Sequence, residues 1–402
     1  MPLNNIENSK VDITMEFCGL KFPNPFVLAS GPPTAYGSMI KRAFKMGWGG
    51  AVLKTLKPDD MDIEYVKPRF SVIKTGHGEI VGFQNIELVT KRSLSVWLEE
   101  IKEIKREYPD RVLIASIMAE VEKKSWQELA SKVEEAGIDA VELNFSCPHG
   151  MPEKGVGAAI GQDAQLTEEI TRWVKEAVNV PVIVKLTPNV TDITAIAKAA
   201  KNGGADGLAA INTVQYLIGV DLDTLEPLPS VNGYSTYGGY SGLAVKPIGL
   251  RTVAQLAKYT DLPISGIGGI TSWEHALEYM LLGASCVQLC TAVMIKGFSI
   301  IHGLIKGLEN YLMRKEVDSL KKLIGRSIER VTDYSMLKVE TKTVEIKKDW
   351  CINCGECVKV CRDAGYNALT LNPDRGLIID KNKCDGCSLC THICSRKALY
   401  IA

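Results

Sequence analysis

Twelve cysteines are the most chemically informative residues of this 402-residue chain, and eight of them lie in its last 52 residues. These eight form two runs with the spacing C-x2-C-x2-C-x3-C, which begin at Cys351 and Cys384. Thiolates at this spacing wrap a cubane iron–sulfur cluster, and the fourth cysteine of each run ligates the other cluster. A pair of zinc sites is the alternative, but zinc sites rarely need four cysteines in so short a run.

The crossed ligation predicts two [4Fe–4S] clusters. The first cluster would take Cys351, Cys354, Cys357 and Cys394, and the second would take Cys384, Cys387, Cys390 and Cys361. The segment resembles two-cluster ferredoxins, although Arg362 and Ser395 follow the fourth cysteines where that family usually has proline. Because such a module moves single electrons, we expect another redox centre elsewhere in the protein.

A second group of reactive side chains follows an apolar, strand-like run. Ala140–Phe145 is apolar except for Glu142 and Asn144, and Pro148 and Gly150 then end the strand. An amide, a hydroxyl, a thiol and an imidazole occur there within six residues, on Asn144, Ser146, Cys147 and His149. Taken alone, this pattern is equally consistent with a polar turn and a structural cysteine.

Eight apolar runs alternate with helical patterns and place these residues in a fold. The runs are Phe26–Ser30, Gly50–Thr55, Val112–Ile117, Ala140–Ser146, Val182–Leu186, Gly207–Asn212, Pro263–Gly268 and Cys286–Thr291. The helical patterns are Leu94–Tyr108, Trp126–Ala136, Ala164–Val178, Ile193–Asn202, Pro247–Tyr259 and Trp273–Leu282. The alternation predicts an α/β (β/α)8 TIM barrel, with a doubly wound open sheet as the alternative.

Three domains are expected along the chain. Residues 1–300 form the barrel with an N-terminal hairpin, 301–344 a helical arm and linker, and 345–402 a small α+β ferredoxin-like domain. Two connections within the barrel are long, Leu56–Arg92 with a predicted hairpin and Val214–Lys246. Long loops at the C-terminal ends of barrel strands usually cover a substrate site.

Polar residues at the ends of the predicted strands suggest an anionic ligand. Gly268 and Gly269 follow the seventh strand and Thr291 follows the eighth, where backbone N–H groups of a barrel often hold a phosphate. Lys54 and Lys185 also emerge from strands, and a flavin ring or another anion would explain two inward-facing lysines. Solvated strand ends are the alternative for both lysines.

Several segments resemble dihydropyrimidine dehydrogenases, and the barrel is shared with dihydroorotate dehydrogenases. The similar segments are 26–33, 53–55, 82–88, 144–150, 184–189, 210–214, 238–242 and 268–270. The barrel and the cysteine-rich tail together are similar to the FMN- and iron–sulfur-containing, pyrimidine-reducing subunit of bacterial two-subunit enzymes. The resemblance extends from residue 12 to residue 400.

This resemblance implies the ligands and the residues that hold them. FMN would be bound by Ser30, Lys54, Thr55, Lys185, Gly242, Gly268, Gly269, Cys290 and Thr291. A pyrimidine would be bound by Asn85, Asn144, Asn212 and Thr213, and Cys147 would be the acid/base. The family's mobile loop would carry Gly155, Gly157 and Gly161.

The implied chemistry agrees with the residue types. Asparagine amides match the alternating C=O and N–H groups of uracil without adding charge. A thiol with a pKa of roughly 8.5 is mostly protonated at neutral pH, so Cys147 can supply the proton that accompanies hydride transfer from flavin. His149 is either a residue that tunes this thiol or an ordinary loop histidine.

The predicted function is therefore interconversion of uracil or thymine and their 5,6-dihydro forms. Gly266-Ile-Gly-Gly lacks the full dinucleotide fingerprint, so electrons are expected from an FAD- and NAD(P)H-binding iron–sulfur partner subunit in a hetero-oligomer. One alternative is a dihydroorotate dehydrogenase or a related cyclic-amide or enone reductase. The loop cations Lys154 and Arg69 are available for the carboxylate of orotate, but nothing singles one out. Another alternative is an electron-relay subunit without its own substrate.

Composition narrows the class of partner and the location. Lys+Arg and Asp+Glu are both 47, so net charge is zero, which argues against nucleic acid or an acidic membrane surface as partner. No apolar run reaches the roughly 18 residues that a membrane span needs. The polar segment Met1–Lys10 lacks a signal-peptide core, and a cytoplasmic location is expected.

Overall fold

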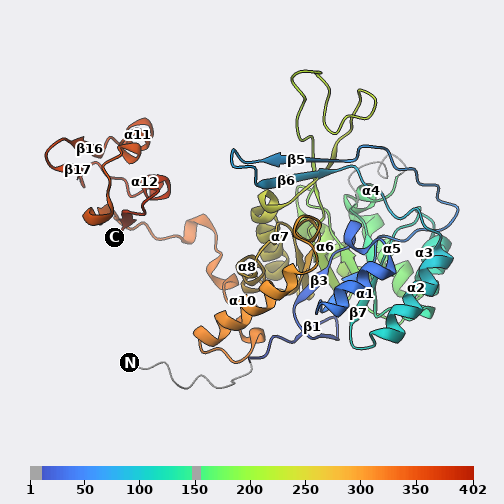
Figure 1. Ribbon diagram of the computed structural model, residues 1–402. Coiled ribbons are helices and arrows are strands. Elements are labelled where there is room, and N and C mark those ends of the chain that lie inside the picture. The colour runs from blue at the N-terminus through green and yellow to red at the C-terminus, as the bar shows by residue number, and fades with distance from the viewer. Residues whose placement is uncertain (1–10, 147–154) are drawn as a thin grey trace. The chain divides into compact units, whose positions relative to one another are not determined.

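The apolar runs form the centre of the first of two structural units. Within residues 11–146 and 155–402, which the computed structural model describes, eight parallel strands close a barrel in the order β10-β13-β14-β3-β4-β7-β8-β9 (Figure 1). They are β3 Phe26–Leu28, β4 Gly50–Val52, β7 Val112–Ile117, β8 Ala140–Asn144, β9 Val182–Lys185, β10 Gly207–Ala210, β13 Ile264–Ile267 and β14 Ala284–Leu289. The predicted TIM barrel is confirmed.

Amphipathic helices cover the outside of the barrel. In α2, Leu94, Trp97, Ile101 and Ile104 are buried at helical spacing, so one face packs on the strands. The helices of this unit are α1 Gly37–Lys45, α2 Leu94–Glu107, α3 Lys123–Glu135, α4 Ala158–Gly161, α5 Ala164–Lys175, α6 Ile193–Asn202, α7 Lys246–Tyr259, α8 Trp273–Leu281, α9 Thr291–Lys296 and α10 Ile300–Arg314. Helix α1 was not predicted, because its apolar face is short.

An N-terminal hairpin closes the end of the barrel where the strands begin. Strands β1 Met15–Phe17 and β2 Leu20–Phe22 pair antiparallel, and Phe17 and Phe22 are buried. Gly207, the first residue of β10, packs so closely on this hairpin that an added Cβ would lie 2.4 Å from Cys18 Sγ. The other end of the barrel is therefore the one available for a ligand.

A four-stranded antiparallel sheet, here called the lid sheet, is built from the two long connections. Its order is β11-β12-β6-β5, with β5 Phe70–Lys74, β6 Ile80–Asn85, β11 Val214–Tyr216 and β12 Gly238–Ser241. The predicted hairpin is β5–β6, and the pairing of β6 with β12 was not predicted. Figure 1 shows β5 and β6 at the end of the unit opposite β1.

Helix α10 packs with the barrel rather than in a separate arm. Ile301, Leu304, Leu308 and Leu312 are buried in the core cluster of the barrel. Residues 319–331 form two 3-10 turns, Leu320–Leu323 and Ile328–Arg330, rather than a regular α-helix. The contacts within the chain divide the molecule after Val331. Residues 301–331, which were expected in the arm and linker, therefore belong to the first unit.

The second unit, Thr332–Ala402, is small and repeats one motif. Strand β15 Val344–Ile346 pairs with β18 Leu399–Ile401, and β16 Leu369–Asn372 pairs with β17 Gly376–Ile379. Helices α11 Glu356–Asp363 and α12 Leu389–Ile393 each begin after a left-handed residue, Gly355 or Ser388. The repeated cysteine run is therefore a repeated loop-and-helix structure.

The long loop between β11 and β12 exposes apolar side chains. Leu222, Leu225 and Tyr234 are 85%, 76% and 80% exposed.

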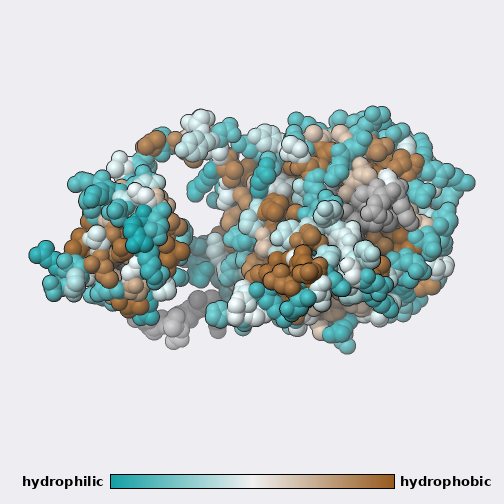
Figure 2. Space-filling model, turned by 90° about the horizontal axis from the view of Figure 1, so that it is seen from above, coloured by the Kyte–Doolittle hydropathy of each residue, from teal (hydrophilic) through white to brown (hydrophobic). Residues whose placement is uncertain are grey.

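Seen from above, the first unit shows apolar atoms gathered among hydrophilic ones (Figure 2). Among the described residues, no helix has the length and apolar character needed to cross a membrane.

Candidate active site

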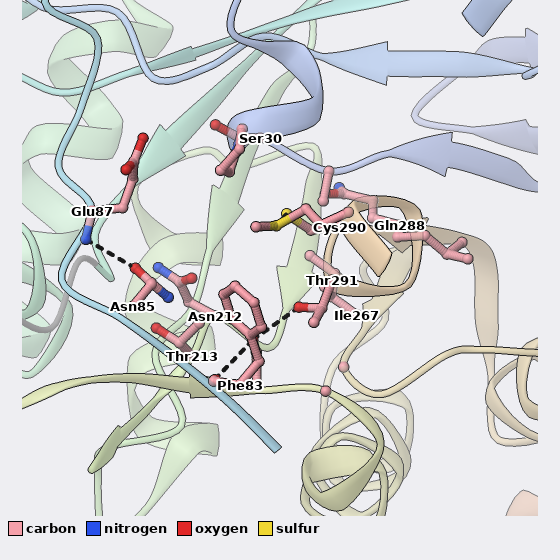
Figure 3. Close-up of a pocket in the computed structure, with 18 of the residues that line it drawn as sticks. Ser30, Phe83, Asn85, Glu87, Asn212, Thr213, Ile267, Gln288, Cys290 and Thr291 are labelled. Atoms are coloured by element: carbon pink, nitrogen blue, oxygen red, sulfur yellow. Dashed lines mark hydrogen bonds between the residues drawn. The ribbon is translucent and has the colours of Figure 1, made fainter. Parts of the chain in front are cut away.

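All described residues of the predicted flavin and pyrimidine sites line one cavity at the C-terminal ends of the barrel strands. They are Ser30, Lys54, Thr55, Asn85, Asn144, Lys185, Asn212, Thr213, Gly242, Gly268, Gly269, Cys290 and Thr291. The cavity has about 1140 Å³ of empty space, counting the part open to solvent. In Figure 3, Asn85, Asn212 and Thr213 lie on one side of it, and Cys290 and Thr291 lie on the other.

Tight glycine turns form one wall of this cavity. Gly242, Gly268 and Gly269 have φ of 92°, 126° and 67°, which residues with a Cβ rarely adopt. A Cβ on Gly269 would also lie 2.8 Å from the backbone N of Lys246 and 2.9 Å from the carbonyl O of Gly242. Tyr279 donates a hydrogen bond to the Gly268 carbonyl at 2.7 Å, so the N–H of Gly269 points the opposite way. Such turns suit a phosphate.

Cys290 and Thr291 complete this wall after β14. Thr291 Oγ1 lies 2.8 Å from Ser241 Oγ, which joins the barrel to the lid sheet. The Cys290 sulfur packs against Gly31, where an added Cβ would lie 2.6 Å from it. Burial raises the pKa of Cys290 to about 11 despite the opposing charges of Lys185 and Lys54. This thiol is therefore neutral at physiological pH and a poor nucleophile.

Lys54 is held by a carboxylate that it shares with an arginine. Its Nζ lies 3.1 Å from Glu87 Oε1, and Arg69 Nε donates to Glu87 Oε2. The Lys54 and Glu87 side chains are only 7% and 9% exposed, so the pair is screened from solvent. Arg69 precedes β5 and Glu87 follows β6, so the hairpin brings them together.

Lys185 belongs to a second buried polar group, whose members come from strands β8, β9 and β14. Its Nζ is 3.5 Å from Glu142 Oε1, and Glu142 Oε2 accepts a hydrogen bond from Gln288 Nε2 at 3.0 Å. Within the described part of the chain, Gln288 Oε1 is buried without a hydrogen-bond partner. Because Gln288 lines the cavity, this unpaired acceptor fits a bound ring that carries an N–H group.

A hydrogen-bond network fixes two of the asparagines. Asn144 Nδ2 donates to Thr55 Oγ1 at 2.9 Å, and Asn144 Oδ1 accepts from Ser146 Oγ at 3.0 Å. Asn212 Nδ2 donates to Ser146 Oγ at 2.8 Å. The fully buried Ser146 thus connects amides from two strands and sets their orientation.

Asn85 and Thr213 belong to the lid side of the cavity. Asn85 Nδ2 donates to the Gly239 carbonyl at 3.1 Å, and its Oδ1 accepts from the Glu87 backbone N–H at 3.2 Å. Thr213 is packed so closely on Gly239 that an added Cβ there would lie 2.2 Å from Thr213 Oγ1. The lid sheet therefore positions both side chains.

The predicted acid/base, Cys147, lies outside the described residues, as do His149 and Lys154. Its preceding neighbour, Ser146, is anchored by its hydrogen bonds to Asn144 and Asn212. Among the glycines predicted for the loop, Gly155 and Gly157 have φ of 75° and 64°. A Cβ on Gly161 would lie 1.8 Å from the Phe145 carbonyl O, so that glycine allows close packing against the end of β8.

In the second unit, each predicted cluster set lines its own cavity. Cys351, Cys354, Cys357 and Cys394 surround about 410 Å³ of empty space, and Cys361, Cys384, Cys387 and Cys390 surround about 370 Å³. The described cysteines are free thiols. Within the described chain, no three metal-binding side chains converge as a single ion requires. The cavities leave room for a larger group, which fits cubane clusters.

Backbone N–H groups also reach these sulfurs. Val344 N–H points at Cys384 Sγ at 3.5 Å, and Ala398 N–H at Cys394 Sγ at 3.3 Å. Hydrogen bonds to sulfur are one means of setting a cluster potential. Arg362, which replaces the usual proline, is exposed and pairs with Asp363.

Four polar residues were not assigned to the site from the sequence. Glu87 and Gln288 line the cavity. Glu142 and Ser146 lie behind it, in contact with Lys185 and Asn144, which line it. Glu142 and Gln288 sit two positions before Asn144 and Cys290, so they share the inward face of their strands. A charged or amide residue at such a position in an apolar strand is the signal that could have found them. Glu87 lies in a loop and gave no periodic signal.

Comparisons with known proteins agree with both units. A family model described as dihydroorotate dehydrogenase matches residues 12–312. A second, described as a 4Fe-4S dicluster domain, matches residues 344–400.

Similar proteins include enzymes for two different pyrimidines. The chain is 41% identical over 395 residues to NAD-dependent dihydropyrimidine dehydrogenase subunit PreA of Escherichia coli, covering 95% of this chain and 93% of that protein. It is 41% identical to the chloroplastic dihydropyrimidine dehydrogenase (NADP(+)) of Arabidopsis thaliana, over 87% of both. It is 39% identical to the dihydroorotate dehydrogenase B (NAD(+)) catalytic subunit of Pyrococcus furiosus, over 78% of this chain and 98% of that protein.

Proposed function

This chain belongs to the dihydroorotate dehydrogenase family and, over most of its length, to the dihydropyrimidine dehydrogenases, and we propose that it interconverts uracil or thymine and their 5,6-dihydro forms. It is an oxidoreductase whose cofactors are FMN and two [4Fe–4S] clusters. The contacts around the cavity support a role for each of its walls.

The convergence of three asparagine amides on the cavity carries the proposal. Asn85 ends a strand of the lid sheet, Asn144 ends β8 and Asn212 follows β10, and a hydrogen bond from its side chain fixes each of the three. Uracil is a neutral ring with alternating donors and acceptors, which side-chain amides can match. Such a set of neutral groups would orient the ring without requiring a charge on the ligand.

The opposite wall is proposed to hold FMN. The turns at Gly242 and Gly268-Gly269, together with Thr291, would bind the phosphate, and Lys185 and the unpaired Gln288 acceptor would face the ring. Bound FMN supplies or accepts the hydride of the reaction. The chain's own task is to place the ring, hold the pyrimidine beside it and exclude water.

Cys147 is proposed to exchange the proton that accompanies hydride transfer. It follows Ser146 directly in the sequence, and Ser146 is buried and hydrogen-bonded to Asn144, one of the proposed pyrimidine ligands. An ordinary thiol is mostly protonated at neutral pH and can donate to a ring carbon and take the proton back. The loop that carries Cys147 runs to the glycines at 155 and 157.

Electrons are proposed to reach the clusters from a partner subunit that binds FAD and NAD(P)H. Two observations support this: the tail belongs to a dicluster family, and the Escherichia coli relative is named as a subunit of an NAD-dependent enzyme. The electron-relay alternative, without a substrate, is disfavoured by the complete amide set in the cavity.

Turnover of uracil against orotate tests the proposal. The holoprotein, supplied with electrons by a reduced viologen, should reduce uracil, and activity on orotate alone would sink the assignment. Cys147→Ala should lower uracil turnover by at least ~100-fold, the typical contribution of a positioned acid or base, while FMN stays bound and reducible. Cys286→Ala, a change at a buried thiol outside the cavity, is the matched control. Full turnover by Cys147→Ala would refute the proton-transfer role.

A further inference from the structure

The two proposed iron–sulfur sites differ in the charges that line them. Among the described residues, the cavity of the second site has one charged side chain, the carboxylate of Asp385. The cavity of the first site has two of opposite sign, Glu356 and Arg396, and Glu356 also pairs with Lys359 at 2.7 Å. Apolar Ile352 takes the position in the first run that Asp385 takes in the second. The surroundings of the second site are therefore the more negative of the two.

Within residues 155–402, which the structure describes without a gap, no ion pair cancels the charge of Asp385. The two lysines that precede it in the sequence pair with other carboxylates, Lys381 with Glu345 and Lys383 with Asp380. The Tyr366 hydroxyl donates a hydrogen bond to Asp385, which raises the pKa of Tyr366. Because Tyr366 lines the same cavity, this neutral partner holds the carboxylate beside the site without adding a charge.

The sulfurs of the first site have hydrogen-bond donors near them. Ala398 N–H points at Cys394 Sγ at 3.3 Å, and Asn353 Oδ1 lies 3.5 Å from Cys351 Sγ. A thiolate bound to iron can only accept a hydrogen bond, so the Asn353 amide, turned over, would present its NH2 group to the sulfur. Two of the four thiolates of this site therefore have a donor.

The N–H groups that follow Cys361, a ligand of the second site, bind oxygen instead. Tyr366 and Asn367 donate to the Cys361 carbonyl O at 3.2 and 3.3 Å rather than to its sulfur. In the described second unit, one N–H reaches a sulfur of this site, from Val344 to Cys384 Sγ at 3.5 Å. The second site thus combines more negative charge with fewer donors to its thiolates.

From these differences we infer that the two clusters have unequal reduction potentials, and that Asp385 and Arg396 are residues that set the difference. Negative charge near a cluster disfavours the added electron, whereas positive charge and hydrogen bonds to the sulfurs favour it. The first cluster therefore has the higher potential and takes the first electron, and the second cluster takes the next one. An electron that enters at the second cluster moves downhill to the first. The inference goes beyond the pyrimidine chemistry and rests on the proposed cluster ligands.

An anaerobic redox titration of the holoprotein, followed by the electron paramagnetic resonance signals of the reduced clusters, tests this order. The unmodified protein should take up its two cluster electrons in two separate one-electron steps. Asp385→Asn keeps the size of the side chain and removes its charge, so the lower-potential step alone should shift, and it should shift upward. The equilibrium constant of that step should change by about threefold or more, which is roughly 30 mV for one electron and the scale of one unit charge in water-like surroundings.

The opposite change on the other site gives a second, independent variant. Arg396→Gln removes the positive charge of the first site, so the higher-potential step alone should shift, and it should shift downward. This variant decides the question if Asp385→Asn assembles fewer irons than the unmodified protein. Asp374→Asn is the matched control, because it makes the same change at an exposed carboxylate of this unit that lines neither cavity. It should leave both steps where they are.

Coincident midpoints of the two clusters in the unmodified protein would overturn the inference without any variant. A shift of the higher-potential step by Asp385→Asn, or no shift of the higher-potential step by Arg396→Gln, would also overturn it. Iron analysis separates this result from the cluster assignment. About eight irons with equal potentials would refute the inference alone, whereas a protein without cubane clusters would refute the proposed ligands as well.

Discussion

The two lysines in the cavity differ in how their charge is balanced. Lys54 shares Glu87 with Arg69, whereas Lys185 faces Glu142 at 3.5 Å without a hydrogen bond between them. Glu142 is fully buried, and a buried charge is costly unless a countercharge lies near it. The second pair therefore depends on both members being present.

Breaking the Lys185–Glu142 pair should destabilise the barrel. Lys185→Met leaves Glu142 charged in the core, and we expect a loss of about 3–5 kcal/mol in the free energy of unfolding. The double variant Lys185→Met with Glu142→Gln removes both charges and should recover much of that loss. Thermal unfolding of the holoprotein and of the two variants provides the comparison. A double variant less stable than the single one would contradict the pairing.

The thiols of the barrel should differ in reactivity. Because the pKa of Cys290 is raised to about 11, only about one thiol in a thousand is ionised at pH 8. Its alkylation should therefore stay slow until the pH approaches 11. A thiol without burial ionises near pH 8.5. We expect Cys147, the proposed proton donor, to react before Cys290.

Mass-spectrometric mapping after brief treatment with iodoacetamide checks this order. The clusters should be intact, so that their cysteines are ligated. Uracil should slow the labelling of Cys147 if the proposed site is correct. Faster labelling of Cys290 than of Cys147 at pH 8 would contradict the burial argument.

The sequence allowed prediction of those site residues that lie at the ends of strands. Lys54, Lys185 and Asn144 interrupt apolar runs, and the C-terminal ends of parallel barrel strands meet at one opening, so their convergence follows from the fold. The partners of these residues were not predictable. Glu142 and Gln288 meet across the barrel interior from strands 146 residues apart, and no local pattern encodes that contact.

The lid sheet joins two connections of the chain that are far apart in the sequence. Strand β6 comes from the connection after β4 and β12 from the connection after β10, and Asn85 pairs with Gly239 across them. The sequence indicates the β5–β6 hairpin because a turn separates two apolar runs. The long-range pairing is decided by packing over the barrel, which a local pattern does not report.

Two glycines one turn apart in helix α10 allow a test of how this helix packs. A Cβ added to Gly303 would meet open space, whereas a Cβ on Gly307 would lie 2.0 Å from Trp273 Cδ1. Gly303→Ala should therefore stabilise the barrel by ~0.5–1 kcal/mol, through helix propensity. Gly307→Ala should destabilise it, because the Trp273 ring packs on Tyr311 and has to move.

The midpoints of thermal unfolding of the two variants measure these opposite changes in stability. The two changes are chemically identical and lie in the same helix, so each controls for the other. A higher midpoint for Gly307→Ala than for Gly303→Ala would contradict the close packing of Gly307 against Trp273.

The whole molecule combines two units with separate cores. The barrel core includes Leu304 and Leu308 of α10, and the second unit has its own core around Val344, Leu369 and Leu399. The proposed cluster ligands belong to the second unit, and the proposed flavin ligands to the first. Loss of a cluster should therefore leave the flavin site intact.

Cysteine substitution tests this independence. Cys354→Ala removes a proposed ligand of one cluster, and Cys387→Ala removes the matched proposed ligand of the other. Each variant should fall from about eight irons to about four and keep its full FMN content. Iron, sulfide and flavin analysis of the purified proteins measures this. Loss of FMN together with iron would mean that the two units depend on each other for folding.

Transfer of reducing equivalents to a pyrimidine tests the central claim most directly. The protein is reduced anaerobically and then mixed rapidly with uracil or, in a separate experiment, with orotate, while the flavin absorbance is followed. Uracil should reoxidise the flavin and yield dihydrouracil, and orotate should leave it reduced. Reoxidation by orotate with no response to uracil would contradict the account.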